Sequence, residues 1–288
     1  MFKEKVRPMK FASFTHAGRA SYGLVTDGGI VDLARRFPEA PTLRSFIAGG
    51  LERAAAFTAA PADVALDDVA LDPVIPDPDK IVCVGLNYHD HVTETGRTVT
   101  PNPMLFARYP GSQVGSGAAL VKPLESDEFD YEGELAVIIG KGGRRISEAD
   151  ALSHVAGYAC YNDASVRDWQ RHTSQFMPGK TFAATGGFGP WMVSADEIPD
   201  PTQLKLTTRL NGQQVQQTSV DLMITPIPTL IAYTSTILPL LPGDVIVSGT
   251  PGGVGARRTP KLFMKDGDVV EVEVSGVGVL RNPVVAER

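Results

Sequence analysis

Two glutamates stand two residues apart in front of an apolar run near the middle of the chain. Glu132 and Glu134 lead into residues 135–139, which are apolar on both faces and therefore typical of a buried strand. Because side chains alternate along a strand, both carboxylates would point to the same side. Two like charges at the mouth of a buried strand repel each other, and a divalent cation that prefers oxygen ligands, Mg²⁺, Mn²⁺ or Ca²⁺, would hold them together. The alternative is a solvent-facing strand end on which each glutamate pairs with a lysine or arginine.

A third carboxylate stands at the end of another apolar run. Asp163 follows the strand expected at residues 155–160 and precedes a helical pattern, where it would serve either as a helix N-cap or as a metal ligand. Together with Glu132 and Glu134 it would supply three carboxylate ligands. Such a site leaves coordination positions for water and substrate, which metal-assisted catalysis requires.

A histidine and a glutamate are spaced as a proton-transfer pair. His91 and Glu94 are three residues apart, so they lie side by side on a helix or turn. A carboxylate that holds a histidine orients the ring and raises its basicity, which enables the ring to take a proton from water. An exposed polar loop is the alternative, and a metal site made of His89 and His91 has only a weak spacing in its favour.

Two further groups are placed to meet an anionic substrate. Lys180 lies between turn residues and a glycine-rich run, either as a substrate contact or as a solvated side chain. Arg167 and Gln170 follow Asp163 on the same helical face, where they either contact a substrate carboxylate or form a surface salt bridge. The glycine loop at residues 249–255 lacks the Gly-Lys-Ser/Thr ending of a phosphate loop, which excludes nucleotide binding, but its backbone N–H groups could cradle an oxyanion.

The elements that position these residues are mostly strands. The chain has 288 residues, 43% of them hydrophobic, with 29 glycines and 22 prolines, which indicates an ordered, β-rich body with many turns. A proline-dense connector at residues 71–79 divides it into a small amino-terminal domain, residues 1–75, and a main domain, residues 76–288. Residues 97–120 read as irregular. Strands are expected at residues 9–33 as a small β module and at 80–85, 135–139, 155–160, 204–210, 213–217, 243–250, 269–274 and 277–279, and helices at 42–60, 147–154, 164–172 and part of 226–241.

Charge and composition exclude several classes of partner. The formal net charge is −6 and the pI about 5.4, which argues against nucleic acid as the main partner. Prolines interrupt the long apolar segment at residues 224–241, which makes it a poor membrane span. The two cysteines stand in apolar runs, and the amino-terminal stretch has no apolar core for a signal peptide, so a cytoplasmic location is expected.

Several of these motifs occur together, and in the same order, in one known family. They are Gly85-Leu86-Asn87-Tyr88 followed by His91 and Glu94; Asp130-Tyr131-Glu132-Gly133-Glu134; Asn162-Asp163 followed by Ser165, Arg167, Asp168 and Gln170; Gly179-Lys180; Gly189-Pro190; Pro242-Gly243-Asp244; and Gly249-Thr250-Pro251. With this combination, over about residues 80–285, the chain resembles the fumarylacetoacetate hydrolase superfamily. The amino-terminal module resembles the small domain of bacterial two-domain members.

The resemblance implies a fold, a metal and a set of roles. The implied fold is α+β and β-rich, a mixed β-sandwich roll with a small amino-terminal domain, assembled as a homodimer. The implied cofactor is Mg²⁺ or Mn²⁺, bound by Glu132, Glu134 and Asp163. The remaining implied roles are catalysis by His91, Glu94 and Lys180, and substrate binding by Arg167, Gln170, Thr250 and Tyr88.

The activity expected from the resemblance is hydrolysis of a carbon–carbon bond in a 2,4-dioxo acid of the acylpyruvate or fumarylpyruvate type, as in the catabolism of aromatic compounds. Glu94 would hold His91, His91 would activate a water molecule, and the cation would stabilise the enolate that cleavage leaves. The alternative is an oxaloacetate decarboxylase or tautomerase, or a related isomerase or lyase, that acts on a 2-oxo acid with the same metal site. A ligand-binding protein without activity is a further rival, against which the intact set of catalytic residues argues.

Overall fold

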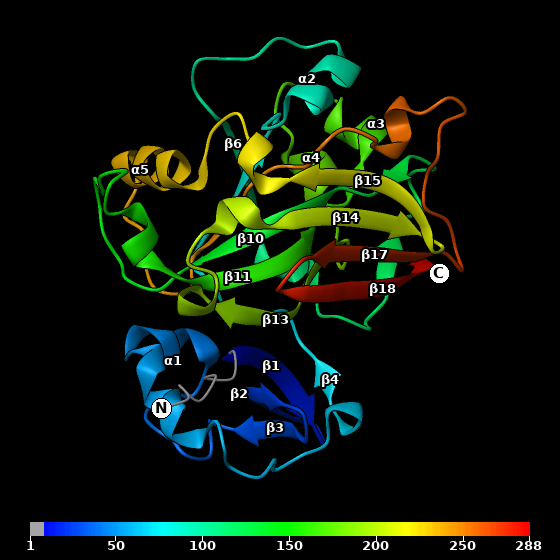
Figure 1. The fold of residues 1–288 in the computed structure, drawn as a ribbon. Coiled ribbons are helices and arrows are strands. Elements are labelled where there is room, and N and C mark those ends of the chain that lie inside the picture. Colours follow the sequence, from blue (N-terminus) through cyan, green and yellow to red (C-terminus); the bar gives the residue numbers. More distant parts are fainter. Residues whose placement is uncertain (1–8) are drawn as a thin grey trace.

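Two β-sheets lie face to face in the computed structural model, which describes residues 9–288 (Figure 1). The strands of the large sheet are, in spatial order, β3 (Gly29–Asp32), β2 (Arg19–Thr26), β1 (Lys10–His16), β13 (Gly186–Ser194), β11 (Val155–Asn162), β10 (Gly133–Ile139), β16 (Val245–Val247), β5 (Ile81–Gly85) and β6 (Met104–Arg108), with β4 (Ala70–Leu71) beside β1 and β7 (Gln113–Val114) beside β13. The smaller sheet runs β15 (Gln213–Ser219), β14 (Lys205–Leu210), β17 (Val269–Val274), β18 (Gly278–Ala286) and β8 (Leu120–Lys122). A separate pair joins β9 (Phe129–Asp130) and β12 (Ser165–Val166).

The central strand β10 is buried on both faces, as its apolar run predicts. Leu135, Val137 and Ile139 lie in the core between the two sheets. Ala136 and Ile138 lie in a second core on the opposite face of the large sheet. This division follows from the two-residue period of a strand, and it explains why the run shows no polar alternation.

The amino-terminal module occupies the second face. It contains β1 to β4 and α1 (Leu43–Ala48) and lies below the sandwich in Figure 1. Its sheet continues the large sheet, because Lys10 pairs with Val193 and Phe11 with Met192. The division into domains at residue 75 stays a prediction, and residues 1–8 of the predicted small domain lie outside the described residues.

The helices are short, and three of those expected differ from the structure. The predicted helix at 42–60 is interrupted by a glycine pair, so that α1 is followed by a 3₁₀ helix at Leu51–Phe57. The predicted helix at 147–154 is wrong except for a 3₁₀ turn at Ala151–His154. The predicted helix at 164–172 begins as β12, because pairing with β9 overrides the local helical pattern.

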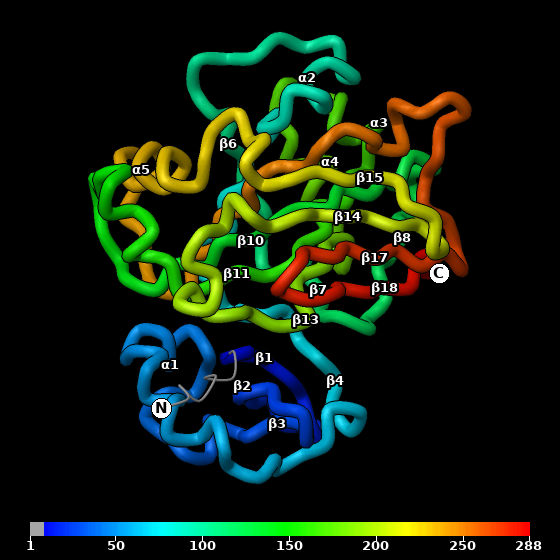
Figure 2. Tube along the Cα trace, viewed as in Figure 1, coloured from blue at the N-terminus to red at the C-terminus, as the bar shows by residue number. Residues whose placement is uncertain are grey.

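Four further α-helices of residues 9–288 lie outside the two sheets, and α2 lies at the top end of the sandwich in Figure 1. They are α2 (His89–Thr95), α3 (Arg167–Gln170), α4 (Met177–Lys180) and α5 (Ile227–Ile237). Further 3₁₀ helices lie at Leu66–Asp68, Pro110–Ser112, Ala195–Glu197, Pro201–Gln203, Val220–Leu222 and Gly255–Arg257. The loop between α2 and β6 arches over this end, and the chain ends in β18 beside β17 (Figure 2). None of the helices in residues 9–288 has both the length and the apolar character needed to cross a membrane.

The stretch at 97–120 is more regular than expected. It contains β6 and β7 and the beginning of β8, and β6 pairs along its whole length with β5. Strand pairing of this kind depends on a partner distant in sequence, so local composition did not indicate it.

Candidate active site

Three carboxylates meet where two neighbouring strands of the large sheet begin and end. β10 and β11 are antiparallel with Gly133 opposite Asn162, so the residue before β10 lies beside the residue after β11. The N–H of Asp163 accordingly donates to the carbonyl of Glu132 at 2.8 Å. Side-chain oxygens of Glu132, Glu134 and Asp163 all lie within 4.8 Å of one another. We call these three side chains the carboxylate cluster.

The carboxylate cluster is buried and only partly compensated by cations. The exposed fractions of Glu132, Glu134 and Asp163 are 4%, 2% and 0%. Lys180 Nζ donates to Oε2 of Glu132 at 2.5 Å and to Oδ2 of Asp163 at 2.6 Å. Glu134 forms no ion pair with a residue in the described part of the chain, and its Oε2 accepts from the backbone N–H of Gly249 at 2.5 Å. One negative charge in the cluster is therefore left without a cationic side chain.

This unequal compensation separates the pKa values within the cluster. Burial raises the pKa of Glu134 well above its usual value, and the charges of Asp163 and Glu132 raise it further. Burial also acts to raise the pKa of Glu132, but the charges of Arg167 and Lys180 outweigh it and lower that pKa to about 2. Burial acts to lower the pKa of Lys180, and the charges of Asp163 and Glu132 raise it overall. Lys180 is therefore held as an ammonium group.

A divalent cation fits this donor set. The ligand atoms are carboxylate oxygens, which suit Mg²⁺ and Mn²⁺. The uncompensated Glu134 supplies the reason for a cation at this place, since an unpaired buried charge costs several kcal/mol. The solvent-facing strand end considered from the sequence does not occur, because all three side chains are buried, although Glu132 and Asp163 do pair with basic residues.

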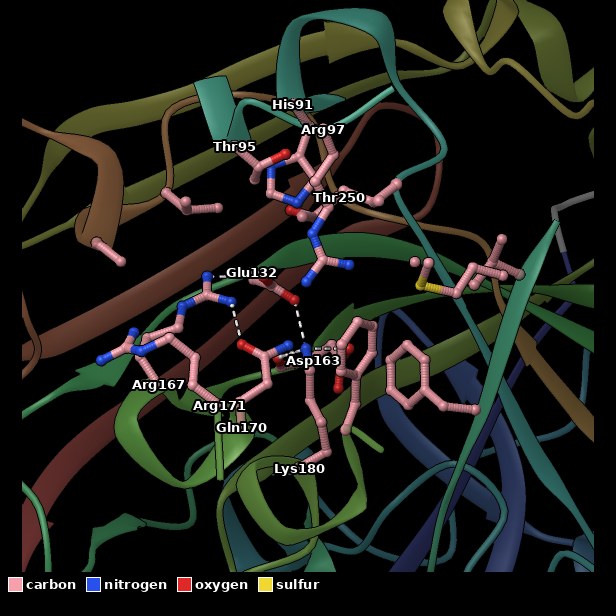
Figure 3. Close-up of a pocket in the computed structure, with 18 of the residues that line it drawn as sticks. His91, Thr95, Arg97, Glu132, Asp163, Arg167, Gln170, Arg171, Lys180 and Thr250 are labelled. Carbon is pink, nitrogen blue, oxygen red and sulfur yellow. Dashed lines mark hydrogen bonds and ion pairs between the residues drawn. The ribbon is translucent and has the colours of Figure 1, made fainter. Parts of the chain in front are cut away.

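His91 and Glu94 form the predicted pair on α2. Nδ1 of His91 lies 2.7 Å from Oε1 of Glu94. Because a carboxylate only accepts, Nδ1 carries the proton and Nε2 is left with its lone pair. His91 is 6% exposed, so the polar-loop alternative is wrong, and His89 is exposed on the same helix and lies outside the carboxylate cluster. In Figure 3, His91 lies across the site from Asp163 and Lys180.

The glycine loop at residues 249–255 binds carboxylates of the chain itself. The N–H of Gly253 donates to Oε2 of Glu94 at 2.8 Å, and the N–H of Gly255 donates to Oδ1 of Asp130 at 2.8 Å. The expectation that these N–H groups cradle a substrate oxyanion is therefore wrong for both glycines. The loop instead positions the carboxylate that holds His91.

Arg167 is a buried part of the site. Its Nε donates to Oδ2 of Asp130 at 2.8 Å, its Nη1 donates to Oε1 of Gln170 at 3.1 Å, and its Nη2 lies 2.7 Å from Oε1 of Glu132. Burial acts to lower the pKa of Arg167, and the charges of Glu132 and Asp130 raise it overall. The surface salt bridge considered from the sequence is wrong, because Arg167 is 7% exposed. Asp130 was part of a motif in the sequence, but its role as the anchor of Arg167 emerges from the fold.

Arg108 was not predicted as a functional residue. It lies at the end of β6, is 2% exposed, and donates from Nη1 to Oδ1 of Asp163 at 2.6 Å and to the carbonyl of Ala164 at 2.9 Å. Its Nη2 donates to Oγ1 of Thr185 at 3.0 Å. The apolar run Met104–Phe106 before it was the signal that could have placed it on a buried strand.

Of the last two residues predicted to contact substrate, Thr250 lines the cavity and Tyr88 does not. Thr250 lines the site, where its hydroxyl donates to the carbonyl of Gly133 at 3.0 Å and accepts from Gln216 Nε2 at 2.9 Å. Tyr88 is 1% exposed in the core between the sheets, and its hydroxyl has no hydrogen-bond partner in residues 9–288. Tyr88 does not belong to the cavity wall, and its expected contact with the substrate stays a prediction.

One cavity of about 710 Å³ joins these groups. Its walls carry the carboxylate cluster, His91, Gln170 and Thr250, together with apolar side chains of β5 and β6. The cationic side chains in the wall outnumber the carboxylates, although the whole chain is acidic, and they are Arg97, Arg167, Arg171, Lys180, Arg257 and Lys261. The cavity is therefore suited to an anionic ligand of small size.

Comparison with known proteins gives consistent results. The family described as "Fumarylacetoacetate (FAA) hydrolase C-terminal" matches residues 80–285. The mitochondrial oxaloacetate tautomerase Fahd2a of Rattus norvegicus is 40% identical over 264 residues, which are 90% of this chain and 84% of that protein. The fumarylacetoacetate hydrolase of Exiguobacterium antarcticum superposes with a TM-score of 0.84 at 35% identity, over 97% of this chain and 100% of the other.

A further solved structure contains a metal ion. The maleylpyruvate hydrolase of Sphingobium sp. SYK-6, in complex with manganese(II) and pyruvate, has a TM-score of 0.81 at 28% identity, over 97% of this chain and 100% of the other. The family match covers most of the chain and includes every member of the carboxylate cluster and the His91–Glu94 pair. This protein therefore belongs to the fumarylacetoacetate hydrolase family of enzymes, and its carboxylate cluster is a candidate metal site.

Proposed function

We propose that this protein interconverts the keto and enol forms of oxaloacetate, using Mg²⁺ or Mn²⁺ bound by Glu132, Glu134 and Asp163. The observation that carries the proposal is the position of His91, whose Nδ1 is held by Glu94 and whose Nε2 is free. His91 lines the same cavity as the carboxylate cluster, and cationic side chains outnumber carboxylates in the wall of that cavity. The similarity to oxaloacetate tautomerases over 90% of the chain favours tautomerisation over hydrolysis.

The reaction needs a base at carbon 3 and support for charge on the 2-oxo oxygen. His91 Nε2 would take the proton from carbon 3, and Glu94 would stabilise the imidazolium that results. The positive charge of the Lys180 ammonium group would stabilise the oxygen that becomes negative, and the imidazolium of His91 would give the proton taken from carbon 3 to that oxygen. A bound divalent cation would supply Lewis-acid polarisation of the 2-oxo group.

Arg167 and Gln170 would position the substrate carboxylate next to the 2-oxo group. Their side chains are joined to each other, and Arg167 is also tied to Asp130, so the pair has little freedom to move. Each terminal nitrogen of Arg167 carries two N–H groups and has one partner in the described part of the chain, so one N–H on each is left for the substrate carboxylate. The proposal requires that a substrate whose carboxylate is bound in this way directs its carbon 3 toward His91.

The test measures two quantities separately: the entry of deuterium at carbon 3 and the identity of the products. Purified protein with Mg²⁺ or Mn²⁺ should accelerate decay of the oxaloacetate enol absorbance and deuterium entry at carbon 3 beyond the rate with metal alone. His91→Ala should lower the rate about 10²-fold or more, and Glu94→Gln should lower it less. Pyruvate release, measured with a coupled dehydrogenase, would indicate decarboxylation instead. No acceleration of the enol decay with either metal would overturn the proposal.

Carbon–carbon bond hydrolysis, the first expectation from the sequence, has one observation in its favour. The same Nε2 could take a proton from water, and the similar manganese-containing structure is named a maleylpyruvate hydrolase. Its identity to this chain is lower, at 28% against 40% for the tautomerase. Incubation with acetylpyruvate and fumarylpyruvate, followed by product analysis, distinguishes the two reactions, since tautomerisation breaks no carbon–carbon bond.

We also propose a homodimer, as the family resemblance implies. Sedimentation equilibrium of the purified chain tests it, and a mass near the 30.7 kDa of one chain would contradict it. The expected cytoplasmic location remains a prediction, whereas the rat relative is named a mitochondrial protein. Fractionation of cells with an antibody against the chain would decide the location.

A further inference from the structure

We propose that Arg97 binds the second carboxylate of a four-carbon dicarboxylate, and so selects oxaloacetate over 2-oxo acids of the same length that lack this charge. The inference rests on the proposed function, because it assigns a residue to the end of the substrate that lies farthest from the 2-oxo group. It depends on the position of Arg97, on its lack of an acidic partner and on its connection to His91.

Arg97 reaches the cavity from above the carboxylate cluster. It follows α2 directly and lines the cavity. In Figure 3 its guanidinium points away from the backbone of this segment, toward Glu132 and Asp163, on the same side as His91. A substrate bound between the carboxylate cluster and α2 would therefore meet this guanidinium at the end that lies nearest α2.

The guanidinium of Arg97 has no carboxylate partner in residues 9–288. Its recorded side-chain contact is the ring of Phe176, 5.4 Å from Cζ to the ring centroid. By contrast, Arg167 is paired with Asp130 and Glu132. Arg97 therefore keeps its donors free for an incoming carboxylate, which a planar guanidinium binds through two parallel hydrogen bonds.

Three other cationic side chains of the cavity wall, Arg171, Lys261 and Arg257, need comparison. Arg171 is already paired with Glu128, with Nη2 2.5 Å from Oε2, and Lys261 lies 3.6 Å from the same glutamate. Arg257 shares with Arg97 the lack of an acidic partner among the described residues, but it belongs to the 3₁₀ helix after the glycine loop. Arg97 differs from these side chains because it directly follows the end of α2, the helix that carries His91.

The backbone of Arg97 is tied to the helix that carries the base. Gly96 ends α2 with φ +69°, and the N–H of Arg97 donates to the carbonyl of Val92 at 3.2 Å. This is the hydrogen-bond pattern of a helix end that needs a left-handed residue, which glycine adopts without strain. The backbone of Arg97 is therefore hydrogen-bonded to the helix that carries His91. In oxaloacetate, carbon 3 is bonded directly to the second carboxylate, so a base and a carboxylate ligand on one segment match two adjacent groups.

The first test measures binding without turnover. Calorimetry with the Mg²⁺-loaded full chain compares malate with 2-hydroxybutyrate, which has a methyl group where malate has its second carboxylate. We expect the wild type to prefer malate and Arg97→Ala to lose about tenfold or more of that preference. Arg97→Lys should keep part of it. Arg19→Ala, an exposed substitution in the amino-terminal module with the same change of charge, should keep all of it.

The second test measures turnover. Arg97→Ala should raise KM for oxaloacetate about tenfold and leave KM for its 4-methyl ester within about twofold, because the ester lacks the charge that Arg97 binds. If Arg97 had a purely structural role, the substitution would change KM for oxaloacetate and KM for the ester by the same factor. Gly96→Ala, which strains the residue that orients Arg97, should change KM in the same direction by a smaller factor.

The outcomes separate this inference from the proposed function. If the wild type prefers malate through Arg97 but does not tautomerise oxaloacetate, the function fails and the dicarboxylate site stands. If Arg257→Ala or Arg171→Ala removes the preference for malate and Arg97→Ala does not, the assignment of Arg97 is overturned. Equal affinity of the wild type for malate and 2-hydroxybutyrate would also overturn it.

Discussion

The backbone N–H of Gly253 donates a hydrogen bond of 2.8 Å to Oε2 of Glu94, and this contact joins the glycine loop to α2. The other carboxylate oxygen of Glu94 accepts from Nδ1 of His91. Glu94 is therefore held at both oxygens, and the direction of the histidine depends on a loop more than 150 residues away in the sequence. A site of this kind is sensitive to small shifts in the loop.

A methyl group at Gly253 should disturb catalysis through Glu94. Gly253 has φ +101°, and an added Cβ would lie 2.4 Å from the carbonyl oxygen of Val215, so the backbone has to move. We expect Gly253→Ala to lower kcat about tenfold or more, because His91 loses its orientation. Steady-state kinetics of oxaloacetate tautomerisation measure the effect.

Gly267→Ala is the matched control for that substitution. Gly267 has a similar φ of +87°, but an added Cβ there has no heavy atom within 4 Å. The control should carry the conformational strain alone, at about 1 kcal/mol in the free energy of unfolding, with kcat unchanged. Similar losses of kcat in both variants would show that strain, and not the hydrogen bond to Glu94, accounts for the effect.

Two glutamates of the carboxylate cluster should respond oppositely to neutralisation in the absence of metal. Glu134→Gln removes a carboxyl that folding must bury either charged, with no cationic side chain to compensate it, or protonated against its usual preference, so Tm of the metal-free protein should rise. Glu132→Gln removes a charge that pairs with Arg167 and Lys180, so the free energy of unfolding should fall by about 3 kcal/mol. Thermal unfolding in the presence of a chelator compares the two.

Both variants should lose the metal. Each removes one carboxylate ligand, and we expect Mg²⁺ affinity to fall by at least about 100-fold in calorimetric titration. Each variant thereby serves as the control for the other, because binding falls in both while stability changes with opposite sign. Unchanged Mg²⁺ affinity in both would contradict the assignment of the metal site.

Local spacing was enough to predict the parts of the site that lie within one element. The two-residue period of a strand puts Glu132 and Glu134 on one side, and the three-residue spacing puts His91 beside Glu94. The apolar run after Glu134 predicted a buried strand for the same reason, and the structure confirms it. Sequence position made Asp163 and Lys180 candidates, each with an alternative left open, and the family resemblance supplied their expected roles and the sandwich fold.

Contacts between distant segments were not predictable from spacing. The register that brings Asp163 to Glu132 depends on how β10 and β11 pair, and a shift by one residue would move the carboxylate to the other face. The segment at 164–172 has a helical pattern, but pairing of Ser165 with Asp130 makes its start a strand. Arg108 was missed because β6 forms only against β5.

The amino-terminal module contains an ion pair whose effect on stability should depend on pH. A hydrogen bond from Arg36 lowers the pKa of Asp63 below its usual value of 3.8, against a smaller effect of burial, and the N–H of Asp32 also donates to Asp63 at 2.8 Å. A carboxyl with a lowered pKa in the folded state stabilises the protein above its unfolded pKa and loses this contribution as pH falls through the folded pKa.

Asp63→Asn should therefore destabilise the protein only where the carboxyl is ionised. At pH 7 the variant should unfold more easily by less than about 1 kcal/mol, since the pair is partly exposed. Between about pH 4 and the lowered pKa below it, the difference between wild type and variant should diminish. Thermal unfolding at several pH values measures this difference, and a difference that grows on acidification would contradict the assignment.

Arg108 compensates the charge of Asp163 and is not part of the cavity wall, so a metal bound by the cluster should partly compensate for its removal. Arg108→Met leaves Asp163 with Lys180 as its remaining ionic partner and should lower the free energy of unfolding of the metal-free protein by about 3 kcal/mol. A divalent cation bound by the cluster would replace part of the missing positive charge. The rise in Tm on adding Mg²⁺ should therefore be larger in the variant than in the wild type.

Arg209→Met is the matched control for Arg108→Met. Arg209 pairs with Glu273 at 2.6 Å, but both side chains are about one-third exposed or more, with fractions of 32% and 41%. Its loss should cost less than about 1 kcal/mol, and the effect of Mg²⁺ should remain that of the wild type, because the pair lies outside the cavity wall. If Mg²⁺ raised Tm equally in all three proteins, Arg108 would be a packing residue with no electrostatic link to the metal site, since a cation that replaces its charge must favour the variant that lacks it.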